Sequence, residues 1–297
     1  AAAGFRRAGD GAGELAAIAQ LAQLAWWRSD VEPLADVAVR FLEMEAQGDE
    51  KAVPLACLAR ALVADLTNRP DDVLAELDRI PERSLNDTWI GLERWMRAAA
   101  LSQLGRPHEA VRLAEESMKT VGPLYEPLVE ATRYGALWMT GAVDDCLAGM
   151  PELVERSAAG GVSEYTAVVC ATYAQLAAAA DRVHDAERYL RRARDLAAVP
   201  RSPLVDVGLV QAEAALRVAV GDEDGARDVL EDYRTRATIG AGIGAAPQQR
   251  ALALWYVLVP DTRPYWDGAD LGPYFTDART LARAVVARRR GDDGPRR

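Results

Sequence analysis

Three arginines, Arg60, Arg97 and Arg133, recur at intervals of 37 and 36 residues. The planar guanidinium group binds carboxylates and phosphates through two parallel hydrogen bonds. If each arginine stands at the same point of a repeated helix pair, the three groups form a row with a spacing of roughly 10 Å. Such a row would bind a small acidic effector. The alternative is that each arginine pairs with acidic neighbours such as Glu93 or Glu130 on adjacent helices.

Large aromatic and amide side chains occur in the first helices of the predicted pairs, as the arginines do. Tryptophan supplies a wide contact area and glutamine supplies hydrogen bonds, a combination suited to binding a peptide. The candidates for such contacts are Trp26, Trp95, Trp138, Gln103 and Gln175. The alternative is that the tryptophans fill the seam between neighbouring repeats.

Residues suited to catalysis or metal binding are scarce. The two histidines, His108 and His184, fall at equivalent turns of distant repeats and cannot converge on one metal ion. The glycine-rich residues 240–244 follow a predicted helix instead of a strand and lack the lysine of a phosphate-binding loop. We interpret them as a linker. The sequence therefore predicts no enzyme activity, no metal and no cofactor.

The elements that must position these residues are pairs of helices that repeat along the chain. The turn within each pair defines a slot that recurs every 36–40 residues, at Ser29, Asn68, Gly105, Gly141, Asp181 and Gly221. Apolar residues stand five after the slot, seven before it and five before it; they are mostly small at the first two offsets and larger at the third. Small residues at fixed offsets let paired helices approach closely. A repeat of this length is typical of an α-solenoid.

The best unit covers residues 92–120, where Ala98 lies seven residues before Gly105 and Ala110 five after it. This pattern resembles the tetratricopeptide repeat (TPR), and the resemblance covers roughly residues 8–235. Three slots depart from it, because Ser29, Asn68 and Asp181 stand where glycine is usual. The resemblance implies that the first helix of each pair lines a concave face.

Two short sequence segments between repeats suggest the class of longer protein to which the chain would belong. Residues 5–10 and 45–49 resemble the junctions in the long repeat arrays of large actinobacterial transcriptional regulators of the LuxR and SARP types. The resemblance implies a C-terminal repeat domain of a larger cytoplasmic regulator. The chain does not begin with methionine, and a segment of a longer protein is one expectation.

Composition excludes several classes of partner. A net charge of −10 with a pI near 4.9 argues against nucleic-acid binding, which needs a concentrated positive surface. No apolar run approaches the ~18–20 residues that span a bilayer, so no membrane contact is expected. The cysteines, Cys57, Cys146 and Cys170, form no C-x-x-C pair and are predicted to be buried free thiols in a reducing cytosol.

We therefore predict an all-α fold, a right-handed α-solenoid of about six TPR-like helix pairs over residues 1–238. Residues 239–297 are expected to supply a glycine-rich break, capping helices and a basic disordered tail. Residues 1–7 would be the end of an earlier helix. The predicted pairs are 12–28 with 32–46, 51–67 with 70–80, 86–104 with 107–120, 124–140 with 143–158, 163–180 with 184–198, and 203–219 with 223–236.

The function expected from these features is that of a non-enzymatic interaction or sensor domain. It would bind a peptide, a partner protein or a small effector in the concave groove and would belong to a larger transcriptional regulator. The alternative is a stand-alone TPR scaffold that assembles protein partners.

Overall fold

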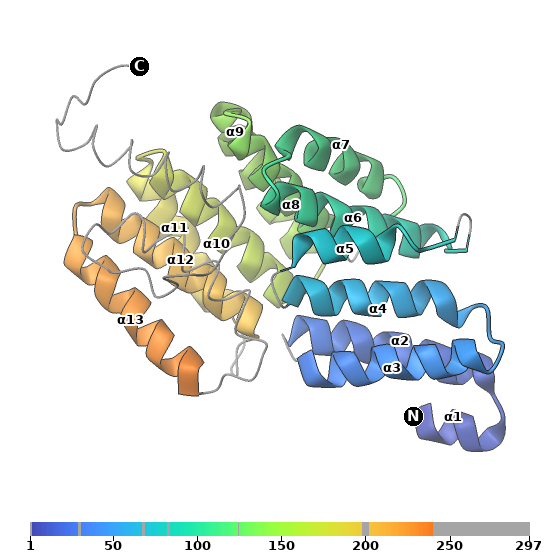
Figure 1. Ribbon diagram of the computed structural model, residues 1–297. Coiled ribbons are helices and arrows are strands. Elements are labelled where there is room, and N and C mark those ends of the chain that lie inside the picture. The colour runs from blue at the N-terminus through green and yellow to red at the C-terminus, as the bar shows by residue number, and fades with distance from the viewer. Residues whose placement is uncertain are drawn as a thin grey trace.

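The computed structural model describes residues 2–28, 31–66, 69–81, 84–123, 125–197 and 202–239. All regular secondary structure in these residues is helical, so the described chain is all-α, as the sequence predicted (Figure 1). The helices are α1 (Ala2–Ala8), α2 (Gly11–Trp27), α3 (Val31–Ala46), α4 (Ala52–Leu66), α5 (Pro70–Leu77), α6 (Asp87–Gln103), α7 (Pro107–Met118), α8 (Glu126–Met139), α9 (Val143–Ala159), α10 (Ser163–Ala179), α11 (Val183–Leu196), α12 (Pro203–Ala219) and α13 (Glu223–Ile239).

These bounds confirm the predicted helices to within a few residues. The helix ends could be predicted because the residues that favour a helix start lie in or next to its first turn. Proline occupies the first turn of α5, α7 and α12, where its missing N–H is not needed. The side chains of Asn86 and Ser202 accept hydrogen bonds from the first turns of α6 and α12. The predicted break, cap and tail at 239–297 lie almost entirely outside the described residues.

The repeated slot is a left-handed turn. Gly105, Gly141 and Gly221 have φ of 72°, 89° and 84°, and Asp181 has a φ of 60°. Among the described residues, Asp181 is the only one other than glycine with a positive φ. Left-handed backbone favours glycine because a Cβ would crowd the following carbonyl. The same turn therefore closes four of the helix pairs.

The residues at the fixed offsets form the seam between paired helices. Those seven before the slot are all buried, and so are those five after it. The first set is Ala22, Ala61, Ala98, Tyr134, Ala174 and Ala214, and the second is Leu34, Val73, Ala110, Cys146, Ala186 and Ala226. Tyr134 is the one large residue of the first set. It fits because it faces Gly149 of α9, where a Cβ would overlap the tyrosine hydroxyl.

Each helix packs against the next along the chain, and the even-numbered helices from α2 to α12 also pack against one another in order. Figure 1 shows the helices stacked in sequence, from α1 at the lower right to α13 at the left. The even-numbered helices, which are the first helices of the pairs, therefore form one continuous layer. Side chains that project from this layer can meet across several repeats.

Helix α1 is tied to the first pair by a buried carboxylate. Glu14 of α2 is 4% exposed and accepts hydrogen bonds from Arg6 Nε at 2.7 Å and from Arg40 NH2 of α3 at 2.8 Å. Burial alone would raise the pKa of Glu14, but the hydrogen bonds from Arg40 and Arg6 outweigh it and lower the pKa. One carboxylate thus links three helices.

Between residues 2 and 239, no helix of the described segments combines the length and the apolar composition needed to cross a bilayer.

Candidate functional site

Two of the predicted site residues meet across the layer of first helices. The ring centroids of Trp26 on α2 and Trp95 on α6 lie 5.4 Å apart, with the ring planes at 86°. This edge-to-face arrangement is one that aromatic pairs prefer. Helix α4 comes between α2 and α6 in the layer. The two tryptophans therefore belong to helix pairs that are separated by one other pair.

The indole N–H of each tryptophan donates a hydrogen bond to a side chain of the following first helix. Trp26 Nε1 donates to Asp65 Oδ2 of α4 at 3.2 Å, and Trp95 Nε1 donates to Thr132 Oγ1 of α8 at 2.8 Å. The apolar rings are therefore held in place by polar contacts at their edges, a combination that fixes ring orientation.

Two tyrosines continue the arrangement. Tyr125, just before α8, donates its hydroxyl to Gln23 Oε1 of α2 at 2.9 Å, across 102 residues of sequence. The ring of Tyr125 lies 6.5 Å from that of Tyr165 on α10. We define the aromatic cluster as Gln23, Trp26, Asp65, Trp95, Tyr125, Thr132 and Tyr165. All of these side chains are partly exposed, so solvent and solutes can reach them.

The aromatic cluster offers hydrogen-bond donors and a negative charge. Burial raises the pKa of Tyr125, and burial with smaller contributions from Tyr125 and Glu164 raises the pKa of Tyr165 to about 12. Both phenols therefore stay protonated at neutral pH. Asp65 supplies a carboxylate, and the cluster as defined contains no arginine or lysine. Its chemistry suits a ligand with apolar, amide or cationic groups.

Sequence reasoning missed the two tyrosines, although a signal for them was present. Trp89, Tyr125 and Tyr165 stand sixteen residues before the slots Gly105, Gly141 and Asp181. An aromatic residue therefore recurs at one offset in three successive repeats.

Arg60 and Arg97 are engaged in ion pairs with acidic residues of or near α5. Arg60 Nε lies 2.8 Å from Glu76 Oε2, and its NH2 contacts Cys57 Sγ at 3.3 Å. Arg97 NH1 lies 2.5 Å from Asp78 Oδ1, and its Nε contacts Glu93. Both guanidinium groups are therefore neutralised by the chain itself.

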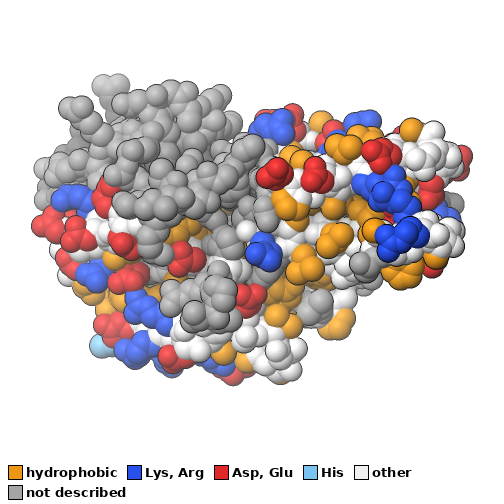
Figure 2. Space-filling view, turned by 90° about the horizontal axis from the view of Figure 1, so that it is seen from below, with side chains coloured by type: hydrophobic (Ala, Val, Ile, Leu, Met, Phe, Trp, Pro, Cys, Tyr) orange, Lys and Arg blue, Asp and Glu red, His pale blue; other side chains and the backbone are white. Residues whose placement is uncertain are grey.

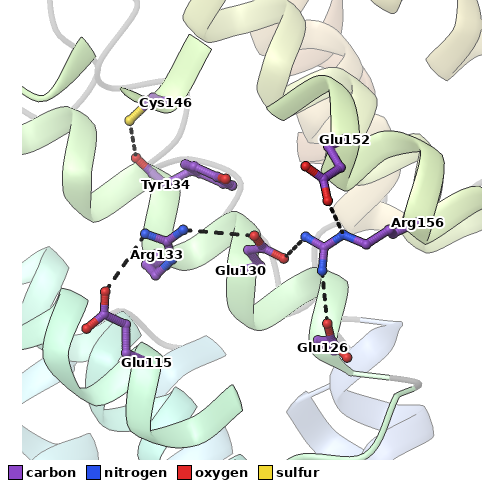
Figure 3. A network of polar contacts seen from close by, with 8 residues as sticks. All are labelled: Glu115, Glu126, Glu130, Arg133, Tyr134, Cys146, Glu152 and Arg156. Atoms are coloured by element: carbon purple, nitrogen blue, oxygen red, sulfur yellow. Dashed lines mark hydrogen bonds and ion pairs between the residues drawn. The ribbon is translucent and has the colours of Figure 1, made fainter. Parts of the chain in front are cut away.

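Arg133 belongs to a wider network between α7, α8 and α9, drawn in Figure 3. Its NH1 lies 3.9 Å from Glu115 Oε1 and its NH2 lies 3.9 Å from Glu130 Oε1. Glu130 is buried and also pairs with Arg156, which lies 3.1 Å from Glu126 Oε1. The guanidinium carbon of Arg133 sits 4.7 Å from the centre of the Tyr134 ring.

The three arginines are thus paired with acidic neighbours, as the alternative expected. Glu93 and Glu130, however, lie on the same helices as Arg97 and Arg133 and not on adjacent ones. The three arginines contact residues of α5, the residue that ends α5, residues of α7 and residues of their own helices, and the aromatic cluster uses none of these residues. Binding of an acidic effector by Arg60, Arg97 and Arg133 stays a prediction.

The remaining predicted site residues lie toward the C-terminal ends of α6, α8 and α10. Trp138 is partly buried against the core formed by α8–α13, as the seam interpretation of the tryptophans anticipated. The Gln103 side-chain oxygen is buried, and no described residue donates a hydrogen bond to it. Gln175 is partly exposed on α10. None of the three joins the contacts that define the aromatic cluster.

The three cysteines are free and buried, which confirms that part of the prediction. Burial raises the pKa of the Cys146 thiol to about 11 and that of Cys170 to about 12, so these thiols are unreactive at neutral pH. Within the described segments, no group of three or more His, Cys, Asp or Glu side chains is arranged to hold a metal ion.

Comparison of the chain with protein-family models, with curated proteins and with solved structures gives no match. The candidate site is therefore defined by its own geometry, a set of aromatic and polar side chains that five first helices bring together.

Proposed function

We propose that the chain is a non-enzymatic interaction domain of TPR-like solenoid architecture, which binds a peptide or an exposed segment of a partner protein on its layer of first helices. The observation that supports this function most directly is the convergence of Trp26, Trp95, Tyr125 and Tyr165 from four separate repeats. Large aromatic rings with fixed polar edges are the side chains that most often dominate peptide and protein recognition.

The ligand is expected to contact the aromatic cluster more than the arginines. Arg60 and Arg97 would have to break ion pairs at 2.8 Å and 2.5 Å before they could bind an anion, whereas the cluster is already partly exposed. Asp65 gives the cluster an acidic character. A peptide with apolar and basic or amide side chains is therefore a better candidate than a small acidic effector.

We also propose that binding biases the curvature of the stack. Trp26 touches Trp95, and Tyr125 touches Gln23, so the aromatic cluster joins helix pairs that are not neighbours in sequence. A ligand that inserts between these side chains would favour a different curvature, and an attached output domain would respond to the shift. This is the behaviour expected of a repeat domain within a larger transcriptional regulator.

The proposal is tested with peptides selected on the wild-type protein from a random display library. Affinities are then measured by calorimetry for the variants Asp65→Asn and Trp95→Phe, with Arg97→Glu combined with Arg133→Glu as the comparison. The cluster variants are expected to weaken binding at least ~10-fold, and the arginine variant to change it less than ~2-fold. The reverse ranking would assign the ligand to the arginine row. Far-UV circular dichroism checks that each variant is folded.

A second candidate, a scaffold for two partners, is favoured by a separate open cleft at the other end of the described chain. The cleft has a volume of about 390 Å³ and lies between α11, α12 and α13. Its charged lining consists of Arg194, Asp206, Glu213, Asp228 and Asp232. Arg194 is paired with Glu213 at 2.5 Å. A basic segment of a second partner would suit this surface, and capture of two proteins at once would distinguish the scaffold from a single-ligand sensor.

A further inference from the structure

The carboxylate of Asp65 is the one charged group of the aromatic cluster, and it is partly exposed. Its oxygen Oδ2 accepts a hydrogen bond from Trp26 Nε1 at 3.2 Å. Among the described residues this is the only hydrogen bond that the carboxylate accepts, and no described arginine or lysine forms an ion pair with it. A carboxylate can accept about four hydrogen bonds. Asp65 therefore retains a negative charge and acceptor sites that the described chain does not use.

Other carboxylates of the first helices are neutralised by the chain itself. Five that are buried or partly buried each pair with at least one arginine, namely Glu14, Glu93, Glu126, Glu130 and Glu213. On the face seen from below, acidic and basic side chains likewise lie next to one another over the described part of the surface (Figure 2). Asp65 departs from this arrangement.

The charge of Asp65 is also an exception to the repeat. Asp65 stands three residues before its turn slot, at Asn68, and the other five residues at this offset are uncharged. They are Trp26, Ser102, Trp138, Ala178 and Val218. The helix pair therefore does not require an acidic side chain at this position, and α4 gains no ion pair from it within the described residues. A role in binding would account for the carboxylate.

The indole rings beside Asp65 provide the second half of a site for a cation. The rings of Trp26 and Trp95 are nearly perpendicular, at 86°, and their centroids lie 5.4 Å apart. Perpendicular rings present their faces at right angles to each other, and a cation within about 6 Å of a ring centroid is attracted to the face. Asp65 contacts the nitrogen edge of Trp26. The carboxylate and the indole faces therefore lie close enough together to act on one cationic group.

A ligand that covers the aromatic cluster removes water from Asp65. An unpaired carboxylate is costly to bury, so a wholly apolar or uncharged ligand would be penalised. A metal ion does not fit either, because no three His, Cys, Asp or Glu side chains of the described segments are arranged to hold one. An organic cation both compensates the charge of Asp65 and packs on the rings.

We propose, as a refinement that rests on the peptide-binding function above, that Asp65 with Trp26 and Trp95 binds an arginine or lysine side chain of the peptide. An N–H of the guanidinium or ammonium group donates to the carboxylate, and the cation lies over an indole face. The nitrogen edge of Trp95 needs nothing from the ligand. Trp95 Nε1 donates to Thr132 Oγ1, which in turn donates to Leu128 O at 3.0 Å. The carboxylate of Asp65 is therefore the group beside the tryptophan pair that selects the ligand.

The requirement for a positive charge is tested with the peptides selected on the wild-type protein. Each arginine of a selected peptide is replaced by citrulline and each lysine by acetyl-lysine, which removes the charge. At one position, calorimetry is expected to show binding weakened at least ~10-fold for the wild-type protein and less than ~2-fold for Asp65→Asn. Asparagine keeps a side-chain oxygen that can accept from Trp26 Nε1, so this variant removes little besides the charge.

Asp36→Asn is the matched control, because it makes the same change of charge at an exposed position of α3 outside the cluster. This variant should keep the charge dependence of the wild-type protein. The cation site is refuted if peptides bind the cluster but neutralising each of their basic residues changes the affinity less than ~2-fold. The peptide-binding function would then still stand.

A second measurement tests the cation site without a selected peptide. N-acetyl-arginine amide and N-acetyl-citrulline amide are titrated into the isotope-labelled protein, and the indole N–H signals of Trp26 and Trp95 are followed by NMR. The arginine compound at roughly 10 mM is expected to shift both signals, and the citrulline compound neither. Asp65→Asn should abolish the response. If no peptide can be selected, a shift would support the cation site and refute the peptide-binding function, whereas no shift would refute both.

Discussion

At the scale of single residues, the turn slot shows how one backbone angle constrains residue choice. Gly141 and Gly221 have φ of 89° and 84°, and a Cβ added to either would meet no atom within 4 Å. The constraint on these glycines is therefore backbone strain alone. Asp181 already bears that strain at a φ of 60°. Aspartate tolerates the left-handed region better than most residues, which explains how this repeat does without glycine.

The backbone conformation of the turn slot predicts opposite changes in the free energy of unfolding for two substitutions. Gly141→Ala is expected to lower the free energy of unfolding by about 1–2 kcal/mol, because alanine is strained in the left-handed region. Asp181→Gly should raise it by about 0.5 kcal/mol, since relief of strain is partly offset by a more flexible unfolded chain. Urea unfolding followed by circular dichroism measures both. A loss for Asp181→Gly as large as that for Gly141→Ala would refute the strain argument.

At the scale of elements, the α8–α9 pair shows two exceptions to the repeat that compensate each other. Tyr134 is the large residue at the position seven before the slot, and Gly149 is the only glycine at the position eight after it. A Cβ at Gly149 would overlap the Tyr134 hydroxyl and lie 2.6 Å from its Cζ. The Tyr134 ring is accommodated because the facing residue, Gly149, has no side chain.

This compensation predicts strong coupling between the two positions. Gly149→Ala alone is expected to destabilise the protein by about 1–3 kcal/mol through overpacking. In the background of Tyr134→Ala, the same change should cost far less, because the clash is gone. The coupling energy in a double-mutant cycle is expected to be about 1–3 kcal/mol. Additive effects within ~0.3 kcal/mol would show that the two residues do not constrain each other.

Local pattern predicts the elements well but predicts their long-range contacts poorly. Slot residues, prolines and caps lie within a few residues of the helix ends that they set, so the helices between 2 and 239 could be read from the sequence. The contact of Trp26 with Trp95 depends on the summed rotation of two successive pairs, which no single repeat encodes. Likewise, nothing in the spacing of Arg97 and Asp78 indicates that they meet.

At the scale of the whole molecule, carboxylates held by arginines make stability depend on pH. The pKa of the buried Glu14 lies below its ordinary value of 4.5. The pKa values of Glu109, Glu155 and Asp222, which are more exposed, are also lowered, chiefly by hydrogen bonds. A group whose pKa falls on folding adds stability above its unfolded pKa. That stability is lost as pH falls through the folded pKa.

We therefore expect the melting temperature to be steady near neutrality and to fall as pH drops below about 4.5. Glu14→Gln should lower the melting temperature at neutral pH and flatten its decline in acid, because Arg6 and Arg40 lose their common partner. Glu109→Gln is the matched control, since surface ion pairs contribute little. An acid profile that Glu14→Gln leaves unchanged would show that this carboxylate does not govern it.

The hydrogen bond from Tyr125 to Gln23 also has a consequence for synthesis on the ribosome. Most helix contacts are between neighbours in sequence, so each pair can fold soon after it emerges. Gln23 can accept its hydrogen bond only after Tyr125, 102 residues farther along the chain, has been synthesised. At about 5–20 residues per second, that delay is roughly 5–20 s. During this interval the side of α2 that carries Gln23 lacks this later contact.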